Sequence, residues 1–89
     1  MFEIGEQMRK SIYSHDQELL QSLLKELRLN SGLRQVDLAE KLRCHQSFVS
    51  KYEAGERRLD ILELRTVCRA LGVGMNEVVQ QLEERLDET

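Results

Sequence analysis

The chain has 89 residues and a net charge of −3; 40% of its residues are hydrophobic, 4% are aromatic, and it contains two cysteines and no proline. This length suits one small domain, and no apolar run reaches the roughly 18 residues that a membrane-spanning helix needs. Two cysteines without a secretion signal are typical of a cytoplasmic protein with reduced thiols, so we expect neither a membrane protein nor a disulfide scaffold.

The first predicted unit is an N-terminal arm over residues 1–15. Within it, Ile4, Met8 and Ile12 recur at every fourth position, which is a weak helical pattern. We expect an arm or one short extra helix here, followed by a compact domain over residues 16–87.

The first helix of this domain is predicted from its leucines. Ser14 or Asp16 can accept a free N–H group of its first turn, and Asn30-Ser31-Gly32 ends it because glycine accepts the left-handed backbone. Between these ends runs one apolar stripe with helical spacing. The stripe consists of Leu19, Leu20, Leu23, Leu24 and Leu27.

Two short helices follow, from about Gln35 to Leu42 and from about Gln46 to Glu53, and a tight turn separates them. Ala39 falls where these helices approach most closely and where a larger side chain would clash. The positions expected to point inward are Leu38, Leu42, Cys44, Val49 and Tyr52. Two short helices with a tight turn and this inward pattern predict a helix-turn-helix.

Two more helices complete the domain. Asp60 and Glu63 form a D-x-x-E capping box at the start of the fourth helix, which ends at Gly72. Gly74 can cap a fifth helix, whose apolar face is expected to be core or a dimer seam. This face consists of Met75, Val78, Val79, Leu82 and Leu86. Together the segments predict an all-α fold of five helices.

The basic residues gather in the middle of the chain. Residues 28–58 hold seven basic and four acidic residues, whereas residues 1–27 carry a net −2 and residues 59–89 a net −4. A local basic face can bind phosphate even when the net charge of the protein is negative. The carboxylates are scattered along helix faces, and we interpret them as solvated surface.

Six short motifs identify the type of domain. They are Gly32-Leu33-x-Gln35, Leu38-Ala39, Gln46-Ser47, Val49-Ser50, Tyr52-Glu53-x-Gly55 and Ala70-Leu71-Gly72-Val73. With these motifs, residues 19–80 resemble the lambda-repressor and Cro-like helix-turn-helix family, also called the Xre family, without a gap. The resemblance implies a compact five-helix DNA-binding domain that is typically dimeric. In such a domain the helix from Gln46 to Glu53 enters the major groove of double-stranded DNA.

The resemblance also implies which residues bind DNA. Side chains on the recognition helix face base edges, where a glutamine amide can pair with adenine and a lysine with guanine or phosphate. These side chains are Gln46, Ser47, Phe48, Ser50 and Lys51. Side chains around that helix are expected at the DNA backbone. They are Gln35, Arg43, Arg57 and Arg58.

Phe48 has two interpretations. By helical spacing it is expected on the outward face with Ser47 and Lys51, where its ring could pack on a thymine methyl group. The alternative is that the ring covers part of the core or a dimer contact. The spacing leaves both open.

Three residues depart from the family pattern. Arg43 stands in the turn where glycine is common, at a cost on the order of 1 kcal/mol if its φ is positive. Arg34 and His45 replace the serine or threonine that usually caps the two short helices. These changes weaken local stability without changing the predicted fold.

We therefore expect a sequence-specific transcriptional regulator, acting as a repressor and as a homodimer through the arm or the helix over residues 75–86. The alternative is an antitoxin or another protein-interaction module that binds DNA secondarily and holds a protein partner. No catalytic constellation, cofactor motif or small-molecule ligand domain is recognisable. Cys44 and Cys68 are expected in the core, so we expect no metal site and no enzyme.

Overall fold

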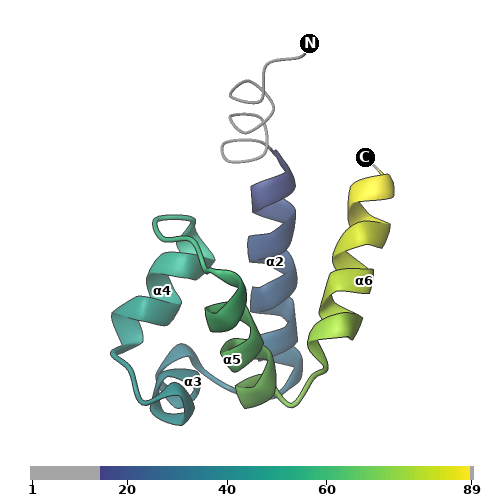
Figure 1. Ribbon diagram of the computed structural model, residues 1–89. Coiled ribbons are helices and arrows are strands. Elements are labelled where there is room, and N and C mark those ends of the chain that lie inside the picture. The colour runs from purple at the N-terminus through teal and green to yellow at the C-terminus, as the bar shows by residue number, and fades with distance from the viewer. Residues whose placement is uncertain (1–14, 89) are drawn as a thin grey trace.

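In the computed structural model, residues 15–88 are described, and over this range the chain forms five helices and no strand (Figure 1). The helices are α2 (His15–Asn30), α3 (Gln35–Leu42), α4 (Gln46–Ala54), α5 (Ile61–Leu71) and α6 (Met75–Asp87). The predicted all-α fold is confirmed, and α3 has its predicted bounds. Residues 1–14, which include most of the predicted arm and the alternative cap Ser14, lie outside the described residues.

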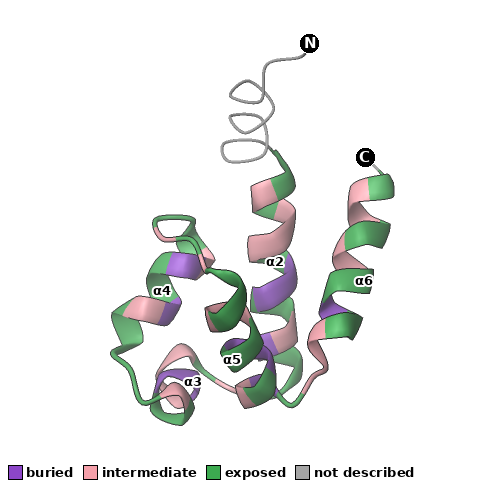
Figure 2. Ribbon diagram, viewed as in Figure 1, coloured by how far each residue is buried: buried purple, intermediate pink, exposed green. Residues whose placement is uncertain are grey.

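The core draws side chains from all five described helices (Figure 2). Because apolar residues recur at helical spacing, each helix turns one stripe inward and leaves the rest exposed. The buried apolar residues are Leu23, Leu24, Leu38, Ala39, Val49, Tyr52, Val67, Cys68, Leu71 and Val78. The leucine stripe of α2 is confirmed as a core face at Leu23 and Leu24, which are buried, and at Leu20 and Leu27, which pack against the core.

The helices pack in two groups that share this core. Helices α3 and α4 pack against each other, α4 also contacts α2, and α3 also contacts α5. Ala39 of α3 is 2% exposed, in agreement with the close helix approach predicted there. On the other side, α6 packs against α2 and α5. Its predicted apolar face divides, because Val78 is buried in the core while Val79 is exposed.

The start of α5 is fixed by the predicted capping box. The Glu63 backbone N–H donates to Asp60 Oδ1 at 2.7 Å, and the Asp60 N–H donates to Glu63 Oε1 at 2.9 Å. The backbone N–H groups of Asp60 and Glu63, which have no partner within the helix, therefore both have an acceptor. At the other end, Gly72 adopts the left-handed backbone with φ 74° and caps α5 as predicted.

The starts of α3 and α4 lack this kind of cap. Arg34 and His45 are the N-cap residues, and neither side chain accepts a hydrogen bond from its helix. Asp37 partly compensates in α3, since its carboxylate binds the Arg34 guanidinium at 2.9 Å and the Arg34 backbone N–H at 2.8 Å. These hydrogen bonds, led by the one from the guanidinium, lower the pKa of Asp37 to about 2.

Arg43 ends α3 in the left-handed conformation. Its φ of 55° is the only positive φ of a non-glycine residue among residues 15–88. The turn is held by backbone hydrogen bonds from Arg43 to Glu40 and from Cys44 to Ala39, at 3.1 and 3.0 Å. The predicted cost of a side chain at this position therefore applies.

Two substitutions of Arg43 separate the effect of backbone strain on stability from the effect of the arginine charge. Arg43→Gly and Arg43→Ala both remove the guanidinium, but only alanine keeps a Cβ atom in the left-handed region. We expect the glycine variant to be more stable than the alanine variant by about 1 kcal/mol. Urea unfolding of the two proteins measures the difference. Equal free energies of unfolding would mean that the turn stores no such strain.

Among residues 15–88, no helix combines the length and the apolar character that crossing a lipid bilayer requires.

Candidate nucleic-acid interface

One face of α4 is exposed and polar. Val49 and Tyr52 of this helix are buried, and the residues that alternate with them on the helical repeat face away from the core. The exposed residues on this side are Gln46, Ser47, Ser50 and Lys51. All four were predicted as DNA contacts, and the structure brings them together on a single helix of nine residues.

The first residues of α3 and α4 are joined through their side chains. Gln46 Nε2 donates to Gln35 Oε1 at 3.4 Å, and Gln35 Nε2 donates to Glu53 Oε1 at 3.0 Å. Gln35 and Gln46 are also the first residues of their helices, where backbone N–H groups have no partner within the helix. Gln35, which was predicted to contact the DNA backbone, thus lies beside Gln46, which was predicted to contact a base.

A buried ion pair lies behind these amides. Arg28 Nε and Nη2 donate to the two oxygens of Glu53 at 2.7 and 3.0 Å, and Arg28 Nη1 donates to the Leu33 carbonyl at 2.8 Å. The two side chains are only 6% and 4% exposed. The hydrogen bonds that Arg28 donates to the Glu53 carboxylate are the main reason that the pKa of Arg28 is raised. A continuous chain of contacts thus runs from α2 through Glu53 to Gln35 and Gln46.

The carboxylates were predicted to be solvated surface groups. This prediction is wrong for Glu53, whose side chain is buried in the ion pair. The two partners are 25 residues apart, and both stand in helices whose other charged residues are mostly exposed. Their pairing comes from the packing of α4 on α2 and has no local pattern in the sequence. The only signal available was the position of Glu53 inside the motif Tyr52-Glu53-x-Gly55.

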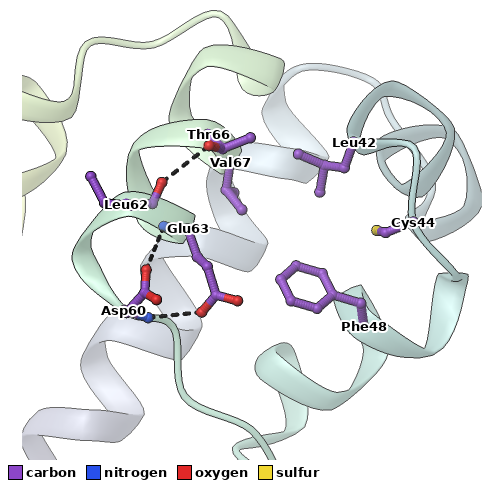
Figure 3. A pocket seen from close by; sticks show the side chains of 8 residues that line it. All are labelled: Leu42, Cys44, Phe48, Asp60, Leu62, Glu63, Thr66 and Val67. Carbon is purple, nitrogen blue, oxygen red and sulfur yellow. Dashed lines mark hydrogen bonds between the residues drawn. The ribbon is translucent and has the colours of Figure 1, made fainter.

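Phe48 does not lie on the outward face, and that prediction is wrong. Its ring packs against the core and meets the Tyr52 ring edge to face, with centroids 5.6 Å apart. Figure 3 shows the ring pointing across to Glu63 and Val67 of α5. The alternative interpretation, in which Phe48 covers part of the core, is the one that agrees with the structure.

Arg57 connects this ring to α5. Its guanidinium lies 4.6 Å from the Phe48 centroid and donates to both carboxylate oxygens of Glu63, at 3.1 and 2.6 Å. The hydrogen bond from Arg57 is the main reason that the pKa of Glu63 lies below its usual range. A cation over an aromatic ring and a two-point ion pair both favour one fixed orientation of α4 relative to α5.

Comparisons with known proteins agree with this geometry. The family model described as Helix-turn-helix matches residues 24–78, which is more than half of the chain. An XRE-family like protein from Pseudomonas syringae pv. tomato is 38% identical, with a TM-score of 0.79, over 88% of this chain and 95% of its own. The chain belongs to the XRE family of helix-turn-helix proteins.

Two other solved XRE-type structures are regulators by name. The restriction-modification controller protein C.Esp1396I, as a tetramer on its natural 35 base-pair operator, is 27% identical with a TM-score of 0.73. The match covers 80% of this chain and 93% of that one. The clp gene regulator ClgR from C. glutamicum is 28% identical with a TM-score of 0.69, over 78% and 88% of the two chains. No curated protein matches the sequence.

A pocket of about 280 Å³ lies between α4 and α5 (Figure 3). Its lining comes from α3, α4, α5 and the turns between them, and consists of Leu42, Cys44, Phe48, Asp60, Leu62, Glu63, Thr66 and Val67. Cys44 is exposed here, so its prediction as a core residue is wrong, whereas Cys68 is buried as predicted. Desolvation raises the pKa of both thiols. Within residues 15–88, no three His, Cys, Asp or Glu side chains are grouped as metal ligands would be.

Tyr52 carries a buried hydroxyl that makes no hydrogen bond with any described residue, and burial raises the pKa of this phenol. A buried polar group without a partner costs free energy, so we expect Tyr52→Phe to raise the free energy of unfolding by up to about 1 kcal/mol, or to leave it unchanged. Tyr52→Leu, which loses the ring contact with Phe48, should be less stable than either. Thermal unfolding of the three proteins tests this. A Tyr52→Phe variant less stable than the unaltered protein would reveal a partner for the hydroxyl.

Proposed function

We propose that this XRE-family protein is a sequence-specific transcriptional regulator that binds double-stranded DNA with α4 in the major groove. The observation that carries the proposal is the exposed polar face of α4, which the Arg28–Glu53–Gln35–Gln46 contacts hold against the rest of the domain. A recognition helix needs both features, since its side chains must reach base edges and its backbone must keep one orientation.

The proposed contacts divide by chemistry. Gln46, Ser47, Ser50 and Lys51 would face base edges, where amide, hydroxyl and ammonium groups can read donor and acceptor patterns. Around them, three side chains would contact the phosphate backbone and fix the register on DNA. These are Gln35, Arg43 and Arg58.

Phe48 and Arg57 are proposed as positioning residues. Phe48 is turned toward α5, and the Arg57 guanidinium is already bound to a carboxylate, which reduces what it can offer to a phosphate. Their contribution to DNA binding would come from holding α4 in place.

We further propose that the protein acts as a homodimer and as a repressor in the cytoplasm, by binding and without catalysis. C.Esp1396I, as the name of its complex states, binds its operator as a tetramer. A homodimer of this chain would place two α4 helices about one DNA turn, roughly 34 Å, apart. Repression would follow where such a site overlaps a promoter.

Selection from a randomised pool of duplex DNA tests the proposal. The full-length protein should enrich one sequence made of two related half-sites, with centres about 10 base pairs apart or a multiple of that distance. Mass measurement of the complex should give two chains per site. A pool that stays random after repeated rounds would contradict sequence-specific binding, and a single half-site bound by one chain would contradict the dimer.

A further inference from the structure

A groove lies between the first turns of α2 and the last turns of α6. It measures about 200 Å³ and is lined by Asp16, Gln17, Leu20, Leu82 and Leu86. In Figure 1 these ends of α2 and α6 stand side by side at the top of the two helices, and α2 lies between α6 and α4. The groove is therefore separate from the proposed DNA-binding face.

The floor of this groove is apolar. Leu20 and Leu82 are half-buried and pack against the core, and Leu86 continues the same stripe one turn further along α6. Elsewhere along the two helices, Arg85 Nη2 of α6 donates to Glu26 Oε2 of α2 at 2.9 Å and ties α6 to α2. A space of this size beside leucine side chains forfeits dispersion contacts unless another apolar group fills it.

We propose that Met8 and Ile12, from the segment that precedes α2 in the same chain, fill this groove. These residues are spaced four apart, so one turn of helix would place both side chains on one face. The occupant would then close the apolar floor formed by Leu20, Leu82 and Leu86.

The connection of the chain places this segment at the groove. Asp16 lines the groove and follows His15, the first described residue. Ile12 is three residues before His15, so its backbone lies within about 11 Å of the start of α2. An attached segment of this length has an effective local concentration on the order of millimolar, which favours it over a separate molecule.

Charge favours the same occupant. The end of α6 carries Glu83, Glu84, Asp87 and Glu88, and the C-terminal end of a helix is itself partially negative. The preceding segment carries Arg9 and Lys10, directly between Met8 and Ile12. Binding of Met8 and Ile12 in the groove would bring these two cations close to the acidic end of α6.

A second copy of the chain fits the groove less well. A stable interface between two proteins usually buries about 800 Å² on each partner and involves about 20–30 residues on each side. The groove offers five lining residues, three of which are apolar. A groove of this size can hold one or two inserted side chains.

Nuclear Overhauser effects in the full-length protein test the proposal. We expect contacts between the Met8 or Ile12 methyl groups and those of Leu82 or Leu86. In a sample that mixes labelled and unlabelled protein, the isotope-filtered experiment should lose these contacts, because they lie within one chain. Contacts that persist in the filtered experiment would assign the groove to a second copy. The absence of any contact would leave the segment outside the groove. Either result overturns the proposal.

A matched pair of variants adds an energetic test. Ile12→Ser should increase the equilibrium constant for unfolding by roughly tenfold or more, because it would remove an apolar side chain that folding buries in the groove. Ile61→Ser makes the same change at a side chain that is already 70% exposed, and should change that constant by less than about threefold. Urea unfolding of the full-length proteins measures both. Equal effects would contradict burial of Ile12.

Discussion

Replacement of Arg28 with methionine is expected to lower the free energy of unfolding by about 3–5 kcal/mol. Methionine keeps much of the apolar stem but removes the guanidinium, so Glu53, which is 4% exposed in the unaltered protein, would lose its cation. The Leu33 carbonyl would also lose its donor. An isolated buried charge is costly because water can no longer solvate it. Since a domain of this size has only about 5–15 kcal/mol of stability, the variant should be close to unfolding at room temperature.

Arg85→Met is the matched control for this substitution. Arg85 also pairs with a glutamate, but the two side chains are 29% and 53% exposed. Pairs in solvent contribute about 0–1 kcal/mol, so this variant should unfold almost as the unaltered protein does. Urea unfolding followed by circular dichroism measures all three proteins. Similar losses for Arg28→Met and Arg85→Met would show that burial does not set the importance of the Arg28–Glu53 pair.

Replacement of Lys51 with alanine is expected to weaken binding to the selected DNA site by about 10–100-fold at constant salt. Lys51 is exposed near the end of α4, on the side that carries Ser47, and its removal should leave the fold intact. Fluorescence anisotropy on the selected duplex measures the loss. If the lysine reads a base, discrimination against a scrambled duplex should also fall. If it binds phosphate, both duplexes should weaken equally and the salt dependence should become shallower by about one charge.

Lys25→Ala provides the control for charge alone. Lys25 is also exposed but lies on α2, outside the proposed interface. It should leave the affinity within about twofold of the unaltered protein, since a distant exposed charge is largely screened at 0.15 M salt. If both lysine variants weakened binding to the same extent, the effect would come from net charge and would give no support to α4 as the recognition helix.

The helices were predictable because their signals are local. Capping by Asp60 and Glu63, the stop at Gly72 and the leucine stripe of α2 each depend on residues within one or two turns. The exposed polar residues of α4 followed from helical spacing together with the family resemblance. The strain at Arg43 was predictable for the same reason, because a turn of known type needs a left-handed residue there.

What could not be predicted depends on how distant segments pack. Phe48 stands on the edge between the buried and exposed faces of α4, and contact with Arg57 and α5 decides which way the ring turns. The burial of Glu53 depends on Arg28, which another helix supplies. Cys44 has an apolar side chain at an inward position of the pattern, yet the turn after α3 leaves it exposed. The spacing of residues in the sequence does not indicate any of these three side-chain positions.

DNA recognition by α4 is tested most directly by anisotropy titration of the unaltered protein on the selected duplex and on a scrambled duplex of equal length, over a series of salt concentrations. We expect the selected duplex to bind at least about 10³-fold more tightly at physiological salt, with the preference retained as salt rises and both affinities fall. Equal affinity for the two duplexes at every salt concentration would contradict sequence recognition. That result would favour the alternative, in which this chain mainly binds a protein partner.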